Sequence, residues 1–256
     1  MKKIPPSPAL APFVRTFEVV ETRDGMTRTL LPETGLIIGF RYSGSATLHE
    51  GASARVLPSA VVTGLRRSAR RMQTSPGGGM ILAKFREGRA ARFFGHPLHE
   101  LFGESRPLDE LVRPGEVARA SDRIAEARTL EERIALLEQF LRALWRPGEP
   151  DRLVLRAVDA IEADPASVRI GALARHFRIS QDALEKRFRR AVGAPPKQLA
   201  SLVRFRRAMA LLRSGVSLTQ LGFEAGYSDQ SHFIRECRRV TGEPPGRFLD
   251  SARDCC

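Results

Sequence analysis

One stretch near the C-terminal end of the chain combines a polar helix head with a run of arginines. It reads EAGYSDQSHFIRECRRVTG, from Glu224 to Gly242. Glycine is favoured where a helix ends, because it tolerates positive φ, and Ser and Asp are favoured where a helix begins. The stretch therefore predicts a helix that ends at Gly226, a tight turn and a second helix. Phe233 and Cys237 share one face of the second helix, which leaves hydrogen-bonding and cationic groups for a partner.

Other chemically active residue types form no recognisable site. The three cysteines, Cys237, Cys255 and Cys256, lack partners at metal-ligand spacing and fit a reducing cytoplasm. His96 and His99 are three residues apart, but the clustered His and Glu of a metal site are missing around them. No nucleophile–base pair is recognisable either. We therefore expect no catalytic residue, no metal and no cofactor, and the protein is not expected to be an enzyme.

Length and charge indicate two domains and an anionic partner. The 256 residues carry a net charge of +13, and the segment from 166 to 256 holds 17 Lys and Arg against 8 Asp and Glu. Such an excess is typical of proteins that bind nucleic acid, an anionic membrane surface or an acidic protein. No apolar run approaches the ~18 residues that span a bilayer, so we expect no membrane partner. Prolines and a glycine in Trp145–Arg152 predict a linker between domains 1–147 and 151–256.

The C-terminal domain contains an internal repeat. Leu173–Leu199 aligns with Leu221–Leu249 at an offset of 48, which becomes 49 after one inserted residue. Each copy predicts a short helix, a tight turn, a longer basic helix, a glycine stop and a Pro-Pro pair. Ser201–Gly215 has apolar residues at helical spacing and predicts a connecting helix. With a leading helix that stops before Pro165, seven short helices are expected.

Two helix-turn-helix units favour binding to double-stranded DNA. An α-helix fits the major groove, which is roughly 12 Å wide and where base edges differ for every base pair. Arginines beside the groove neutralise phosphates and release counterions. Three alternatives stay open at this point: a helical bundle with solvated basic faces, a nonspecific nucleic-acid-binding protein, and a DNA-binding module fused to an unrecognised enzymatic domain.

The residues of the second unit resemble a known family. GYSDQSHFIRECRRVTGEPPGRF, from Gly226 to Phe248, is similar to the second half of the DNA-binding domain of AraC/XylS-type transcription regulators. This resemblance implies a sequence-specific transcription regulator with recognition helices at Ser180–Val192 and Asp229–Thr241. The helices would enter successive major grooves about one turn, ~34 Å, apart. Cys237 and Pro244 depart from the family pattern, which has Phe and Ser or Thr there.

Carried over position by position, the resemblance implies three sets of residues. Candidates for base contacts are Asp182, Glu185, Lys186, Gln230, Ser231, Ile234 and Arg235. Candidates for phosphate contacts are Arg189, Arg190, Arg238 and Arg239. Residues expected in the core are Leu173, Leu184, Phe188, Leu221 and Phe233. The two carboxylates of the first unit can accept from cytosine N4 but repel phosphate, which puts that unit's share of base reading in question.

The first 150 residues predict a β-rich domain followed by helices. FVRTFEVVE, LIIGFRY, ATLHE, SAVVTGL and GMILAKFREG are rich in β-branched and aromatic residues and are separated by Gly, Pro and Ser. The expected fold class is α+β, with a β-rich cupin-like N-terminal domain, trailing helices and an all-α DNA-binding domain. Arg66–Arg71 predicts a solvated strand edge or loop, with a DNA or anionic-ligand contact as the alternative.

The resemblance also implies an input through the front domain. A small-molecule effector or a second protomer would act there, and RNA polymerase is a further expected partner. The amphipathic stretch from Val117 to Leu144 is the expected dimer surface. Both a monomer and a homodimer stay open, because the double helix-turn-helix region can bind DNA as a monomer.

Overall fold

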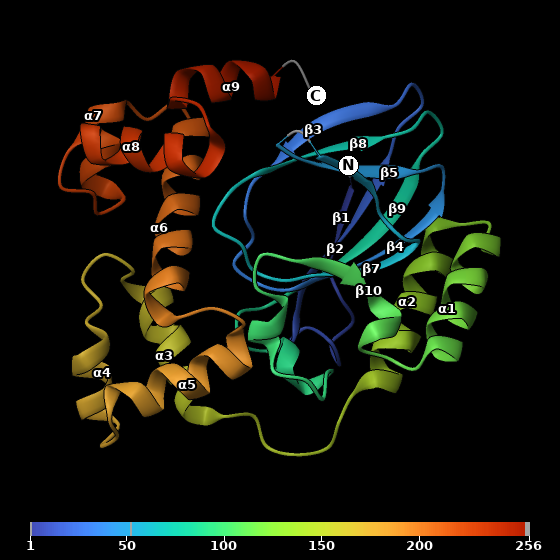
Figure 1. Cartoon of the computed structure of the whole chain (residues 1–256), viewed down its shortest axis with the longest axis horizontal. Helices are drawn as coiled ribbons and strands as arrows, with labels where there is room; N and C mark the ends of the chain where they lie inside the picture. Colours follow the sequence, from blue (N-terminus) through green and yellow to red (C-terminus); the bar gives the residue numbers. More distant parts are fainter. Residues whose placement is uncertain (1, 52, 254–256) are drawn as a thin grey trace.

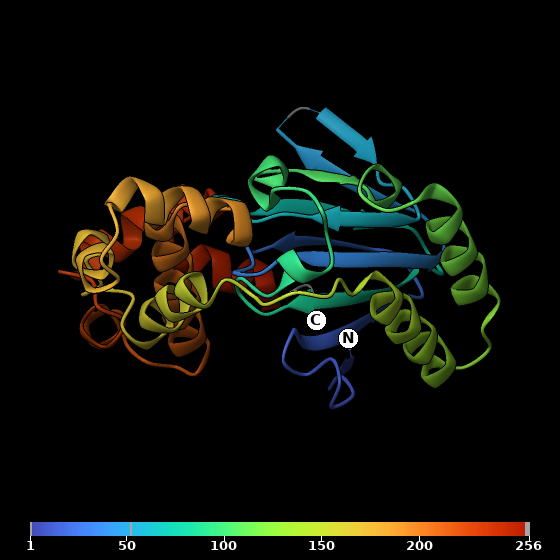
Figure 2. The ribbon, with the colours of Figure 1, turned by 90° about the horizontal axis from the view of Figure 1, so that it is seen from below.

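The computed structural model describes residues 2–51 and 53–253, and Cys255 and Cys256 lie outside this range. Strands occupy the middle of the molecule, and helices lie on both sides of them (Figure 1). The view from below shows a long molecule, with most of the C-terminal helices at one end and the helices α1 (Pro114–Glu126) and α2 (Leu130–Leu144) at the other (Figure 2). The expected order, a β-rich front followed by helices, is confirmed.

The front region contains two antiparallel sheets. The larger sheet has the order β1-β2-β9-β4-β7-β10. Its strands are β1 (Lys2–Ile4), β2 (Val14–Glu21), β4 (Ile37–Ser43), β7 (Ala60–Thr63), β9 (Gly79–Phe85) and β10 (Ser105–Pro107). The strands β2, β4, β7 and β9 of this sheet follow the runs predicted from the sequence. The strands β1 and β10 were not predicted and have only three residues each.

The smaller sheet corrects one expectation about the arginine-rich segment. Its order is β3-β8-β5-β6, formed by β3 (Met26–Leu30), β8 (Arg70–Thr74), β5 (Ala46–Glu50) and β6 (Ser53–Val56). Arg70 and Arg71 begin β8, which pairs with β3 on one side and β5 on the other. The predicted strand edge is therefore an interior strand, and only residues 66–69 form a loop. Strand pairing can override the low β-propensity of such a polar sequence.

Helices and short turns close one face of the larger sheet. The 3₁₀ helices η1 (Ala90–Arg92), η2 (Leu98–Leu101) and η3 (Leu108–Glu110) precede α1 (Pro114–Glu126) and α2 (Leu130–Leu144). Val117 and Ile124 of α1 and Leu137, Phe140 and Leu141 of α2 are buried in the front core. The apolar faces of both helices therefore pack on their own protein, and their amphipathic pattern is explained without a dimer.

In the described part of the chain, seven helices follow residues 148–150, as expected. They are α3 (Arg152–Ala163), α4 (Ile170–His176), α5 (Gln181–Val192), α6 (Pro196–Arg213), α7 (Leu218–Glu224), α8 (Gln230–Thr241) and α9 (Pro245–Arg253). The connecting helix α6 begins five residues before the predicted Ser201, because Pro196 occupies its first turn, where proline is tolerated. Within residues 2–51 and 53–253, no helix has the length and apolarity needed to cross a membrane.

Candidate nucleic-acid interface

The first helix-turn-helix unit consists of α4 and α5. Ser180 caps α5, because its hydroxyl accepts a hydrogen bond from the Ala183 amide at 3.1 Å. Leu184 and Phe188 are fully buried and fix α5 in the core of this unit. The helix ends at Gly193, whose φ of +92° is the left-handed conformation that glycine adopts at little cost. The predicted bounds of this recognition helix are confirmed.

The second unit, α7 and α8, repeats this construction. Asp229 caps α8 by accepting from the His232 amide at 2.7 Å. Phe233 and Cys237 are both fully buried, so the expected inner face of α8 is confirmed. Gly242 ends the helix with a φ of +84°. Cys237 occupies the core position where the family pattern has phenylalanine.

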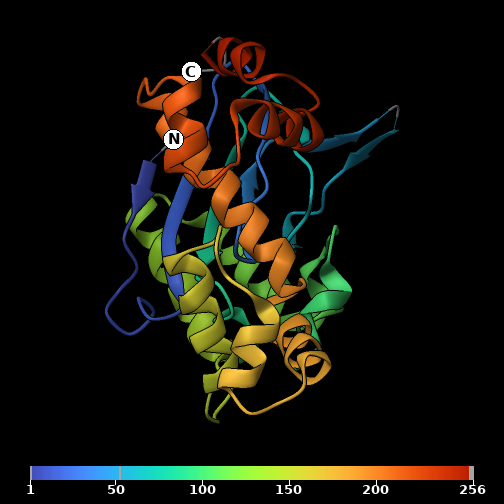
Figure 3. The same cartoon turned by 90° about the vertical axis from the view of Figure 1, so that its left-hand side faces the viewer.

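The predicted contact residues lie on the two helices α5 and α8, which the structure joins through α6 (Figure 3). Nearly all of them are exposed: Asp182, Lys186, Arg189 and Arg190 on α5, and Gln230, Ser231, Arg235, Arg238 and Arg239 on α8. Glu185 and Ile234 are half-buried. The Oε1 atom of Glu185 accepts from the side-chain amide of Gln181 at 3.0 Å, so this carboxylate is already engaged within its own helix.

The expected core residues are buried, with one difference of degree. Leu184, Phe188, Leu221 and Phe233 have no exposed surface. Leu173 is partly buried and packs against the core of the first unit. The spacing of apolar residues in the sequence therefore correctly predicted which faces of these helices are buried.

Sequence reasoning missed Glu236, which attaches α8 to α6. Its side chain is only 4% exposed, and Oε2 accepts from Arg204 at 3.0 Å. Oε1 accepts from Arg239 at 2.9 Å and also from the Ser201 hydroxyl. Burial would raise the pKa of Glu236, but the hydrogen bonds from Ser201 and the charge of Arg204 outweigh it and lower that pKa. The signal was available, because Glu236 lies three residues after the core Phe233 and so near the same face.

The helices α5 and α8 contact the front region with their C-terminal ends. The Ala69 amide donates to the Val240 carbonyl in the last turn of α8 at 2.6 Å. At the end of α5, a Cβ added to Gly193 would lie 3.1 Å from the Leu98 carbonyl oxygen, so the backbones approach closely there. The polar heads of both helices are at their opposite ends.

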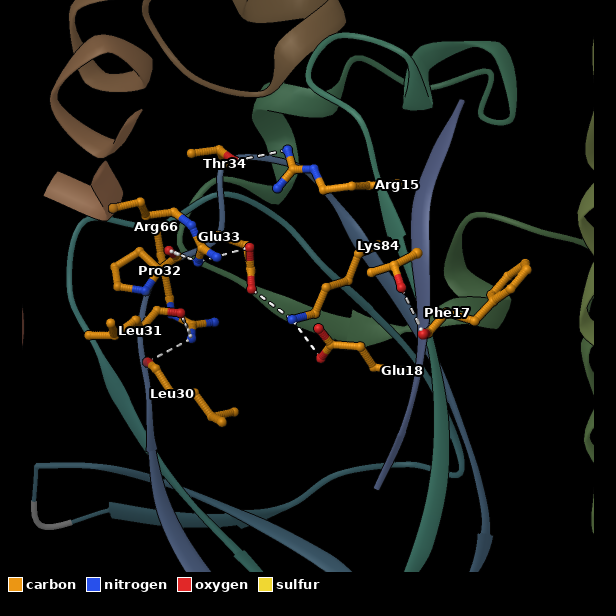
Figure 4. A network of polar contacts seen from close by, with 12 residues as sticks. Arg15, Phe17, Glu18, Leu30, Leu31, Pro32, Glu33, Thr34, Arg66 and Lys84 are labelled. Carbon is orange, nitrogen blue, oxygen red and sulfur yellow. Dashed lines mark hydrogen bonds and ion pairs between the residues drawn. The ribbon is translucent and has the colours of Figure 1, made fainter. Parts of the chain in front are cut away.

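A partly buried polar network also joins the front region to α6 (Figure 4). Glu33, in the connection between β3 and β4, binds Lys84 of β9 at 2.7 Å and Arg206 of α6 at 2.9 Å. Arg206 also donates to the Pro32 carbonyl at 3.2 Å. Burial would raise the pKa of Glu33, but the charges of Arg206 and Lys84 outweigh it and hold that pKa below its ordinary value.

Within residues 2–51 and 53–253, no group of three or more His, Cys, Asp and Glu side chains could hold a metal ion. His96 and His99 are exposed. The described cysteine, Cys237, is buried, and burial raises the pKa of its thiol, which disfavours the nucleophilic thiolate.

Two helix-turn-helix units with buried seams and exposed polar heads define a double helix-turn-helix DNA-binding protein. Residues 173–251 match the family described as "Helix-turn-helix domain", and residues 2–107 match a domain of unknown function, DUF6597. The C-terminal region therefore contains an AraC-type helix-turn-helix domain, and the chain is a DNA-binding transcription regulator. No curated protein matches the chain significantly.

A solved structure of ToxT shares its two-domain architecture. The structure of ToxT from Vibrio cholerae aligns with a TM-score of 0.52 and 13% identity, and the match covers 91% of this chain and 98% of ToxT. At this identity the likeness shows a common two-domain fold. A probable AraC family transcriptional regulator from Rhodopseudomonas palustris CGA009 aligns at 29% identity over 40% of this chain and 98% of that chain, with a TM-score of 0.34.

Proposed function

We propose that the protein is a sequence-specific regulator that inserts α5 and α8 into successive major grooves on one face of the duplex. One observation carries this proposal: each helix buries an apolar seam and exposes a polar head with a basic tail. The 18 residues of α6 correspond to about 27 Å of helix, a rigid spacer between the two units. The Glu236 network supports the proposal, because it makes the position of α8 relative to α6 well defined.

Base contacts are proposed for both helix heads, with α8 carrying the larger share. Arg235 is exposed on α8, one turn after Ser231. A guanidinium forms two parallel hydrogen bonds to O6 and N7 of guanine, which is the commonest base-specific contact. On α5, Asp182, Glu185 and Lys186 are the corresponding candidates, and the engagement of Glu185 with Gln181 favours a smaller role for it.

The experiment is selection of bound sequences from a random DNA pool, followed by binding to single-base variants of the selected operator. Arg235→Ala should cost ~1–3 kcal/mol at one base position and relax the preference there. Phe233→Ala should instead lower the stability of the unit by ~3–5 kcal/mol and weaken binding to every sequence. If Arg235→Ala leaves base preference unchanged, its proposed contact is wrong. Absence of any enriched sequence would favour the nonspecific alternative.

The same proposal covers the domain boundary, the cellular location and the partners of the protein. We place the domain boundary in the segment 148–150, between domains 1–147 and 151–256, and assign the protein to the cytoplasm with no enzymatic activity. The front domain would receive an effector, and RNA polymerase would be a partner at the promoter. Light scattering of the full chain, with and without operator DNA, measures whether one or two copies bind.

A further inference from the structure

A groove of about 630 Å³ lies on the front region, away from the polar heads of α5 and α8. Three segments form it: the turn after β5, the loop 66–69 with the start of β8, and the segment after η2. Its lining residues include four arginines, and we call it the arginine groove. They are Arg66, Arg67, Arg70 and Arg71.

The arginine groove holds more positive charge than its own residues neutralise. Glu50 is the acidic residue of the lining, and its Oε1 atom pairs with Nε of Arg70 at 2.8 Å. Arg66 is only 7% exposed, and its guanidinium donates to the carbonyl oxygens of Ser68, Leu30 and Leu31. Burial and the nearby charge of Arg70 lower the pKa of Arg66 to about 10. Like charges in a partly buried site destabilise the protein unless an anion compensates them.

The geometry of the guanidinium groups suits a small anion. Arg66 and the side chain of Arg70, which is 10% exposed, belong to the protected part of the groove. Arg67 and Arg71 are exposed, and Arg67 lies over the ring of Phe102 at 5.7 Å. Planar guanidinium forks bind carboxylate and phosphate oxygens in pairs. Duplex phosphates lie on a convex backbone, so the half-buried arginines favour a ligand small enough to enter.

Two contacts connect the arginine groove to the second helix-turn-helix unit. Ala69, in its loop, donates its amide hydrogen bond to Val240 of α8. Arg66 donates to the carbonyl of Leu31, and the Leu31 side chain packs against the core of the second unit. A ligand bound in the arginine groove would therefore act on segments that hold α8.

We propose that the arginine groove binds a small polyanion, a phosphate ester or a polycarboxylate, and that its binding is coupled to DNA binding by α8. The proposal rests on the proposed regulatory function, for which it names the effector class and the effector site. Because coupling between two sites is reciprocal, operator DNA must change the affinity for the anion by the same factor as the anion changes the affinity for DNA.

The test is calorimetric titration of the full chain with pyrophosphate and, separately, citrate at constant ionic strength. The two probes distinguish a phosphate ligand from a carboxylate ligand. The double variant Arg67→Gln/Arg71→Gln removes two exposed charges, and binding should weaken by roughly tenfold or more. The matched control is Arg23→Gln, which removes an exposed charge near the opposite end of the β3–β8 pairing and should bind as the unchanged protein does. Anion affinity should also differ between the free and operator-bound chain.

Three results would overturn the proposal. In the first, the unchanged protein binds neither probe. In the second, the double variant binds both probes as tightly as the control. In the third, the double variant loses operator affinity without any anion present, and its salt slope falls by about two, which would assign the arginines to DNA phosphates. Failure to select an operator is a separate result, because it removes the regulatory function while the calorimetry still measures anion binding.

Discussion

Arg238 and Arg239 are neighbours on α8, but their side chains have different surroundings. Arg239 donates to Glu236 at 2.9 Å and to Ser201 at 3.3 Å. Arg238 is exposed, and no hydrogen bond or ion pair of its side chain is found within residues 2–51 and 53–253. The two residues were expected to share a role in phosphate binding. Their contacts favour Arg238 as the phosphate ligand and give Arg239 a structural role as well.

This difference leads to a prediction for Arg238→Ala. The variant should bind all DNA sequences more weakly by a similar factor, and its salt slope should fall by about one, because one phosphate contact is lost. Arg239→Ala should in addition lower the melting temperature, because it removes a partner of the buried Glu236. Binding measured over a range of salt concentrations, together with thermal unfolding, checks both. A loss confined to one operator base would contradict the assignment of Arg238.

At the scale of elements, the start of α8 depends on a charged cap. Asp229 accepts from the His232 amide, and it also accepts from the Ser228 hydroxyl at 3.0 Å. These hydrogen bonds favour the ionised form and lower the pKa of Asp229. Because the folded-state pKa lies below the unfolded value of about 3.9, the cap stabilises the fold above that pH and loses this contribution as the pH falls through the folded value.

Removal of this cap should therefore have an effect that depends on pH. Asp229→Ala should lower the melting temperature at pH 7, because the first amides of α8 lose their acceptor. The difference from the unchanged protein should shrink towards pH 3, because the pH there falls below the unfolded value of about 3.9 and approaches the lowered folded-state pKa of Asp229. Asp229→Asn, which keeps an oxygen acceptor without the charge, is the control. An equal difference at both pH values would argue against a charged cap.

At the scale of the whole molecule, two carboxyl groups meet where the front region contacts α3. Glu87 lies after β9 and Glu162 lies in α3, and a hydrogen bond joins their side chains. Arg15 binds Glu87 and keeps it ionised, so the pKa of Glu87 is lowered to about 2 in spite of burial. Burial, the hydrogen bond with Glu87 and the charge of that carboxylate raise the pKa of Glu162 to about 7. Glu162 is therefore the carboxyl that holds the shared proton.

The raised pKa predicts the direction of a pH effect on stability. The folded state binds the Glu162 proton more tightly than the unfolded state, in which the pKa of Glu is about 4.3. The contribution of this proton to the stability of the fold is therefore fully present below about pH 4.3. It is lost as the pH rises through about 7, the folded-state pKa of Glu162. Glu162→Gln should flatten the fall in melting temperature over this window. Thermal unfolding between pH 4.5 and 8 measures it, with Asp159→Asn as the control for a nearby charge. An unchanged pH profile would contradict the shared proton.

Much of the helical region could be predicted from sequence because its signals are local. Ser180 and Asp229 mark the starts of α5 and α8, and Gly193 and Gly242 mark their ends. Capping hydrogen bonds and glycine conformations involve residues only a few positions apart. The buried faces follow from helical periodicity for the same reason. These features, with the repeat, were sufficient to predict a double helix-turn-helix protein and its outward-facing residues, whose DNA contacts stay a prediction.

The tertiary structure decided the features that depend on residues far apart in sequence. Strand β8, with its arginines and glutamine, became an interior strand because β3 and β5 provide its backbone partners. Glu236 became an attachment point because α6 brings Arg204 within 3.0 Å of it, and the groove around Arg66 formed where three separate segments meet. Helix caps are satisfied within one turn of chain, whereas sheet pairing, buried ion pairs and grooves require chain folding to bring their parts together.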